Sequence, residues 1–252
     1  MRYFLEIAYN GLYYNGWQKQ KNASSVQGEI EKCLEIIFKE KILVKGAGRT
    51  DAGVHARQQF VQFDTNIPLK SNFLYQLNCL FSPYIVARNI YLPFPQELDV
   101  RKNAILRIYK YYIVKQKEPF YKNLVMPFYR KVDVSKMNQA CLELLGYKDF
   151  ASFCKSQGSQ LSTFCRVEYA KWHERGNFLI FTIKANRFLR GMVRAIVGTL
   201  LQIGTGKKNI EEFKALIAAK DRKLAGENVE PYGLYLHRVI YPPYSLQPVE
   251  FT

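Results

Sequence analysis

The pattern of hydrophobic and polar positions in the first part of the chain predicts an alternation of strands and helices. Apolar residues predict a strand over 2–9 and a helix over 26–39, in which Val26, Ile30 and Leu34 share one face. We expect Ser24 to cap this helix, with Gln27 reaching back from the third position. The other elements expected here are strands at 41–45, 59–63 and 85–92 and a helix at 72–81, before residues 93–95 begin a linker.

The second part of the chain repeats this order. A strand over 104–114 precedes a helix over 135–145 and a hairpin whose strands, 164–173 and 178–185, are joined by a turn at 174–177. Asn186 is expected to cap an apolar helix over 188–203, and Asn209 with Glu212 to cap a helix over 210–220. A last strand is expected over 233–240.

The order strand–helix–strand–strand–helix–strand, met twice, predicts an α+β fold of two ferredoxin-like halves. We place these halves at residues 1–100 and 101–252, each with a mainly antiparallel sheet and flanking helices. RNA-recognition domains use the same arrangement. The two halves share no obvious identity, so the repeat concerns architecture alone.

The charge of the chain indicates a polyanionic partner. Its 252 residues include 37 Lys and Arg against 21 Asp and Glu, which gives a net charge of +16, and 15% of the residues are aromatic. Basic residues bind phosphates and aromatic rings stack on bases, so this combination suits a polymer of phosphates and bases.

Cysteine and histidine usage argues against metal chemistry. The five cysteines are dispersed without a C-x-x-C pair, and the three histidines stand far apart, so we expect buried, reduced thiols, no metal site and a cytoplasmic protein. The start of the chain reads as a strand interrupted by Glu6 rather than as a signal peptide, and no apolar run is long enough to cross a membrane. Dinucleotide-binding and phosphate-loop patterns are absent, so no cofactor is expected.

The segment 46–56 carries the most specific chemistry. Its three glycines, Gly46, Gly48 and Gly53, are expected to permit positive φ and close approach of a ligand to the carboxylate of Asp51, with Arg49 two residues before it. The expected flanking strands would mount this loop on a sheet. An isolated Asp among glycines is more often a turn residue that hydrogen-bonds its own backbone.

The whole string G-A-G-R-T-D-A-G-V-H-A at 46–56 resembles the active-site motif of the TruA family of tRNA pseudouridine synthases. Further similarities follow in the family's order along the chain: Y-x-G and G-W-Q near the start, R-x-Y-x-Y at 107–111, D-F-x-S-F at 149–153, F-L-x-x-M-V-R-x-I-V-G at 188–198 and G-L-Y-L at 233–236. The resemblance thus covers nearly the whole chain and implies the pseudouridine synthase fold.

The resemblance also implies an activity. Enzymes of this family isomerise uridine to pseudouridine in the anticodon stem-loop of tRNA, at positions 38–40, as homodimers and without a cofactor. Asp51 would be the nucleophile. Whether it attacks C1′ of the ribose or C6 of the base stays open.

Four other residues receive roles beside Asp51, each with a plainer alternative. Arg194 would pair with Asp51 and keep it ionised, or it lies at a helix edge with its charge in solvent. Tyr109 occupies the position of the family's active-site tyrosine and would stack on the uracil, or it is core. Arg49 would help extrude the base or contact a phosphate. Leu234 would line the pocket or belong to a core strand.

Two further features and two rival functions complete the expectations. His55 is expected to hydrogen-bond within the loop rather than to act as a base, and the Lys-rich, aromatic stretch 115–131 is a solvated loop or an RNA contact. The chain could be a non-catalytic RNA-binding module on the same fold, against which the set Asp51, Tyr109 and Arg194 argues. It could also be a related synthase with another RNA target.

Overall fold

A computed structural model describes residues 1–155 and 162–250 of the chain. The chain folds as two compact units, one formed by residues 1–105 with 236–252 and the other by residues 106–235. A single boundary was expected after residue 100, whereas residues 236–250 here return to the first unit. The described residues form five α-helices and mostly antiparallel strands, an α+β fold as expected.

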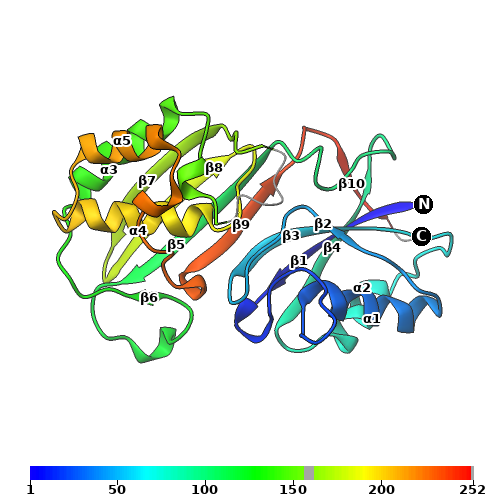
Figure 1. The fold of residues 1–252 in the computed structure, drawn as a ribbon. Helices are drawn as coiled ribbons and strands as arrows, with labels where there is room; N and C mark the ends of the chain where they lie inside the picture. The colour runs from blue at the N-terminus through cyan, green and yellow to red at the C-terminus, as the bar shows by residue number, and fades with distance from the viewer. Residues whose placement is uncertain (156–161, 251–252) are drawn as a thin grey trace. The chain divides into compact units, whose positions relative to one another are not determined.

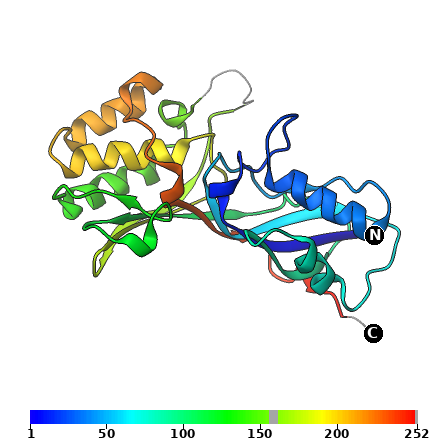
Figure 2. The ribbon, with the colours of Figure 1, turned by 90° about the horizontal axis from the view of Figure 1, so that it is seen from below.

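The first unit is a sheet with two helices. Strands β1 (Arg2–Tyr9), β3 (His55–Asp64) and β4 (Ile85–Pro93) form its centre, with β1 antiparallel to both others. The two-residue β2 (Lys45–Gly46) pairs with β3, and β10 (Leu246–Pro248) pairs with β4. Helices α1 (Val26–Phe38) and α2 (Phe73–Leu80) lie together on one face of these strands (Figures 1 and 2).

The first helix begins at Val26 as predicted, but its N-cap is one residue later than the expected Ser24. Ser25 is its N-cap and accepts a hydrogen bond from the backbone N–H of Gly28 at 3.2 Å. Ser24 instead donates its hydroxyl to the carbonyl of Tyr13 at 3.3 Å, which holds the preceding loop. The strand predicted over 41–45 was largely wrong, because only Lys45 and Gly46 pair with β3.

The second unit has the same general plan. Strand β5 (Leu106–Val114) is antiparallel to β8 (Phe178–Ala185), which is antiparallel to β7 (Val167–Arg175). The short β6 (Met126–Pro127) runs parallel to β5, and β9 (Leu234–Ile240) starts in this unit and ends in the first. Helices α3 (Val134–Gly146), α4 (Met192–Gly204) and α5 (Ile210–Ala219) lie on one side of the strands (Figures 1 and 2).

The caps predicted for α4 and α5 had different outcomes. The capping box of Asn209 and Glu212 is confirmed, with reciprocal bonds of 2.8 and 2.7 Å. The cap predicted at Asn186 is wrong, because α4 begins at Met192 after Gly191, whose φ is 73°. Asn186 binds elsewhere: its side chain accepts from the N–H of Arg166 at 2.8 Å.

Each unit has an apolar core built from its helices and strands. In the first unit α1 buries Val26, Ile30 and Leu34, as their shared face predicted. Four of the five free cysteines are buried as expected, but Cys79 is exposed. Among the described residues, no helix combines the length and the apolar character needed to cross a membrane.

Candidate active site

Asp51 begins a tight turn at the end of the motif loop in the first unit. Its carbonyl accepts a hydrogen bond from the N–H of Val54 at 3.2 Å, which closes a four-residue turn. Gly53, the third residue of this turn, has a φ of 77°, a conformation that favours glycine. Asp51 is half-buried, and β3 begins at His55 immediately after the turn. The turn therefore mounts the carboxylate directly on a central strand.

Thr50, the residue immediately before Asp51, holds the turn in place. Its hydroxyl is 2.8 Å from the hydroxyl of Tyr9 at the end of β1, and both groups are buried. Its carbonyl accepts the N–H of Trp17 at 3.1 Å. Gly16, with φ of 93°, lies so close that a Cβ there would be 2.7 Å from this carbonyl. The backbone at Asp51 is thus held by residues from the start of the chain.

Two glycines of the loop serve different purposes from those predicted. Positive φ occurs at Gly53 but at neither Gly46 nor Gly48. A Cβ on Gly46 would lie 2.5 Å from the ring of Trp17, so glycine there permits close packing. Gly48 has open space around its Cα, and its carbonyl accepts from Gln59 Nε2 at 2.8 Å. Positive φ was expected at all three glycines of the loop, and it occurs at one of them, Gly53.

His55 and Arg49 lie on either side of Asp51 and differ in exposure. His55 is buried, and its Nδ1 accepts a hydrogen bond from the N–H of Gly11 at 3.1 Å. This confirms its predicted role as a hydrogen-bonding residue of the loop. A Cβ on Gly11 would lie 1.9 Å from the carbonyl of Val54, so Gly11 packs directly under the turn. Arg49 is exposed, so its side chain is accessible to a large ligand.

The R-x-Y-x-Y strand of the second unit is β5, and its three motif side chains share one face because strand side chains alternate. Arg107 donates from Nη1 to the carbonyl of Asn186 at 2.7 Å. The ring of Tyr109 is 8% exposed and meets the ring of Phe188 edge to face, with centroids 5.0 Å apart. Two of the three therefore hold the segment that leads into α4.

Tyr111 connects this strand to Arg194 and to the start of β9. Its hydroxyl donates to the carbonyl of Glu230 at 2.7 Å. Burial raises the pKa of Tyr111 well above its ordinary value, and the positive charge of Arg194 opposes that shift, so the two groups lie within electrostatic reach. A Cβ on Gly233 would lie 2.7 Å from the Tyr111 ring, and the next residue, Leu234, is buried.

Arg194 lies in the first turn of α4 and is half-buried. Its Nε donates to the carbonyl of Val229 at 2.7 Å, and its own carbonyl accepts the N–H of Val229 at 3.4 Å. These two bonds fix the guanidinium stem against the 226–230 segment.

Within the second unit the structure brings Tyr109, Arg194 and Leu234 to the neighbourhood of Tyr111. Asp51 and Arg49 belong to the first unit. Sequence reasoning missed Tyr111 and the trio Tyr9, Gly16 and Thr50 as positioning residues. Their signal was present, since Tyr9, Gly16 and Tyr111 all belong to the motifs quoted above, but a motif does not say which partner each residue meets.

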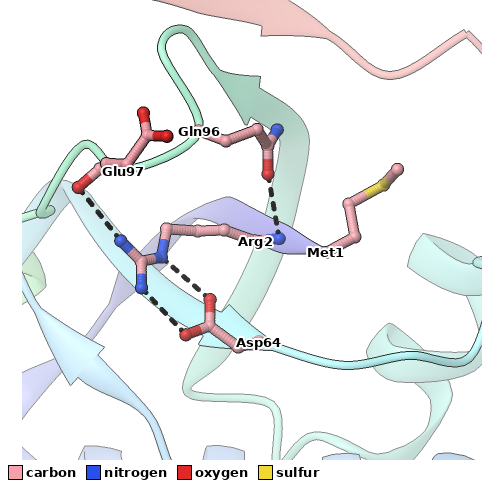
Figure 3. A pocket seen from close by; sticks show the side chains of 5 residues that line it. All are labelled: Met1, Arg2, Asp64, Gln96 and Glu97. Carbon is pink, nitrogen blue, oxygen red and sulfur yellow. Dashed lines mark hydrogen bonds and ion pairs between the residues drawn. The ribbon is translucent and has the colours of Figure 1, made fainter.

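A shallow depression of about 370 Å³ lies at the other end of the first unit's sheet, lined by Met1, Arg2, Asp64, Gln96 and Glu97 (Figure 3). Arg2 pairs with Asp64 across β1 and β3, whereas Tyr9 pairs with Ala56 beside the motif turn. At about 3.3 Å per residue the two ends are separated by roughly 20 Å. Arg2 binds both Asp64 oxygens, at 2.9 and 3.0 Å, which raises its pKa. The depression is therefore lined by an ion pair whose charges are already matched, and it is distinct from the Asp51 turn.

Comparisons with known proteins match this geometry to a family. Residues 140–242 match the family model described as tRNA pseudouridine synthase. A protein of Parabacteroides distasonis named tRNA pseudouridine synthase A is 43% identical over 251 residues, which cover 99% of each chain. The chain belongs to the tRNA pseudouridine synthase A family.

Other relatives with this name agree in length and coverage. The protein of Porphyromonas gingivalis is 43% identical over 247 residues, with 96% of this chain and 97% of the other covered. That of Chlorobaculum tepidum is 36% identical over 239 residues, with 94% and 96% covered. Because these relatives span both units, the family assignment includes the Asp51 loop, which lies outside the residues matched by the family model. The resemblance seen in the sequence motifs is therefore confirmed, and the chain is an isomerase of the pseudouridine synthase class.

Proposed function

We propose that this synthase converts uridine to pseudouridine in the anticodon stem-loop of tRNA, at positions 38–40, with Asp51 as the nucleophile. The observation that supports Asp51 is its setting. One half-buried carboxylate stands on a turn whose backbone is held by Thr50 and Tyr9, with small residues on both sides. A rigidly mounted carboxylate with room beside it suits attack on a carbon of a bound nucleoside.

The reaction makes modest demands on the protein. The N1–C1′ bond breaks, the base turns, and a C5–C1′ bond forms, while the hydrogen on C5 is lost as a proton and N1 gains one. The formula of the nucleoside is unchanged, so no oxidant, reductant or group donor is required. Asp51 would capture either C1′ or C6 while the base turns and would leave again when the new bond forms.

We assign supporting roles to four other residues. Arg194 would keep the Asp51 carboxylate ionised, and Tyr109 would stack on the uracil. Arg49, which is exposed, would help extrude the target base or hold a phosphate. Leu234 would contribute an apolar wall. The same proposal includes a homodimer that binds tRNA, acts in the cytoplasm and needs no cofactor.

The test of this proposal is Asp51→Asn, which keeps the shape of the side chain and removes its charge. Pseudouridine formation in tRNA at positions 38–40, mapped after incubation with pure protein, should fall below detection, while the Kd for tRNA stays within about threefold because the phosphate contacts remain. Asp133→Asn is the matched control, because Asp133 is the N-cap of α3 and asparagine caps helices equally well. It should leave both activity and binding unchanged.

Near-normal turnover by Asp51→Asn would exclude Asp51 as the nucleophile. A wild-type protein that binds tRNA but forms no pseudouridine would favour the non-catalytic RNA-binding module. Pseudouridine at other positions, or in another RNA, would show that the target was wrongly assigned while the reaction was right.

A further inference from the structure

Residues 115–131 of the second unit form an excursion between β5 and α3, which we call the 115–131 segment. Figure 1 shows it as a loop beyond β6 with one short helical turn, η2 (Pro119–Tyr121). None of the roles assigned above to catalysis or base binding uses this segment.

The base of the segment is firmly anchored. Met126 pairs with Ile113 of β5, and the N–H of Phe128 donates to the carbonyl of Val114 at 3.0 Å. The hydroxyl of Tyr235 donates to the carbonyl of Leu124 at 2.7 Å. Val125 and Met126 are buried. The segment is therefore an integral part of the unit, and what it displays is held in place.

The segment displays aromatic rings to solvent both at its short helical turn and next to its anchored base. Phe120 is 87% exposed, and Tyr129 is 62% exposed. The side chain of Glu118 accepts the N–H of Phe120 at 3.4 Å, and Tyr121 packs edge to face on Phe178 with centroids 5.1 Å apart. These contacts fix the short helical turn while the Phe120 ring remains uncovered. An exposed ring on a fixed turn forgoes about 1.5–3 kcal/mol of burial, and its face is open for a base to stack on.

The charges around these rings indicate what kind of partner fits. The segment has five cations and one carboxylate, a net charge of +4 within 17 residues. Lys115 is paired with Glu174 at 2.9 Å. The other four cations, Lys117, Lys122, Arg130 and Lys131, are exposed and make no ion pair with any residue in the described parts of the chain. Exposed cations beside exposed rings suit a chain of phosphates and unstacked bases.

We infer that the 115–131 segment is an additional RNA-binding surface, on which Phe120 stacks on an unpaired base of the tRNA while Lys117 and Lys122 neutralise phosphates. This inference rests on the proposed tRNA substrate. The inference assigns the segment to binding rather than to chemistry. Substitution of Phe120, Lys117 or Lys122 should therefore raise KM and leave kcat at saturating tRNA unchanged.

The test compares variants of the segment with matched changes elsewhere. Phe120→Ala should raise the Kd for tRNA roughly fivefold or more, the effect of losing one stacked base, and Phe120→Trp should restore binding because it keeps a π-face. Tyr75→Ala is the control, since Tyr75 is a 72% exposed aromatic on α2. The double variant Lys117→Gln/Lys122→Gln should lower the slope of log Kd against log salt by roughly 1.5. Lys32→Gln/Lys70→Gln, which removes two exposed lysines of the first unit, should not.

The outcomes separate this inference from the proposed function. If the wild type forms pseudouridine in tRNA but the Phe120 and Lys117/Lys122 variants bind tRNA as tightly as it does, the inference is wrong and the function stands. If the wild type forms none, the function is wrong, and the Kd values still decide the inference. If the variants change the oligomeric state in light scattering without changing Kd, the segment contacts protein and the inference is overturned.

Discussion

At the scale of single residues, the Asp51 turn packs closely against two glycines, Gly11 and Gly16. Gly11 and Gly16 are distant from Asp51 in sequence, yet a Cβ on either would collide with the carbonyl of Val54 or of Thr50. Backbone carbonyls cannot move aside as a flexible side chain can. We therefore expect small changes at these glycines to displace Asp51, the proposed nucleophile.

Gly16→Ala tests this expectation. The new Cβ would lie 2.7 Å from the carbonyl of Thr50, so the turn must shift, and kcat should fall by roughly a hundredfold, the effect of displacing a catalytic group by about 1 Å. Gly176→Ala is the matched control, because Gly176 also has positive φ, 57°, but has nothing within 4 Å of the Cβ position. Both variants should lose about 1–2 kcal/mol of stability through backbone strain. Equal kcat values for the two variants would contradict the argument.

Tyr109 offers a second test at this scale. Its ring is largely buried against Phe188, so Tyr109→Leu should cost about 1–2 kcal/mol in the free energy of unfolding. If the ring also stacks on uracil, the single-turnover rate should fall far more than the unfolded fraction explains, whereas Tyr109→Phe should keep tRNA binding. A leucine variant that is slow only in proportion to its unfolding would identify Tyr109 as a packing residue alone.

At the scale of elements, the short strand before the Asp51 loop is joined to Asp99 by an ion pair. Lys45 of β2 forms an ion pair with Asp99, which also accepts the N–H groups of Arg101 and Lys102 at 2.9 and 2.8 Å. Burial alone would raise the pKa of Asp99, but the hydrogen bonds from Lys45 and from these two backbone groups lower it to about 2.

This pKa predicts how stability depends on pH. The unfolded value is about 3.9, so Asp99 stabilises the fold above that pH and loses its contribution as pH falls toward about 2. Asp99→Asn keeps an acceptor for the backbone groups and loses the ion pair, so it should destabilise by about 1 kcal/mol at pH 7 and by much less near pH 2. Denaturant unfolding at both pH values measures this difference. An equal loss at the two values would show that the charge is unimportant.

The elements that sequence predicted well are those set by nearby residues. The capping box of α5 joins Asn209 and Glu212 within one turn, and β1 was placed at its observed bounds because apolar residues stand close together on both sides of Glu6. The predictions that failed required distant partners. Asn186 was expected to cap α4 but binds Arg166 and Arg107, which belong to other segments. The strand expected before the loop was shortened because only Lys45 and Gly46 meet β3.

In the candidate site, too, the features set by nearby residues could be predicted and those set by distant residues could not. The motif string located Asp51 and the turn around it, because the string itself encodes the turn. It did not show that Tyr9 and Trp17 hold Thr50, nor that Tyr111 meets Glu230 and the charge of Arg194. These contacts join residues more than thirty positions apart, and only the folded chain brings them together.

At the scale of the whole molecule, the net charge of +16 makes a prediction that is independent of any single residue. Each phosphate neutralised by Lys or Arg releases a counterion, so log Kd for tRNA should rise linearly with log salt. Between 50 and 200 mM salt the affinity should fall by about tenfold or more, the result of several phosphate contacts. At saturating tRNA the protein already has its substrate bound, so weaker association no longer limits the rate. The value of kcat should therefore change little with salt.

The measurement is a Kd series by filter binding, run in parallel with single-turnover rates at saturating protein. Asp51→Asn is the control, because it changes the chemistry without removing a cation, so its salt slope should match that of the wild type. A steep Kd with a constant rate would show that the positive charge serves to capture the substrate. A Kd that stays flat over this range would contradict electrostatic capture, and a rate that falls with salt even at saturation would mean that charged contacts also act in the chemical step.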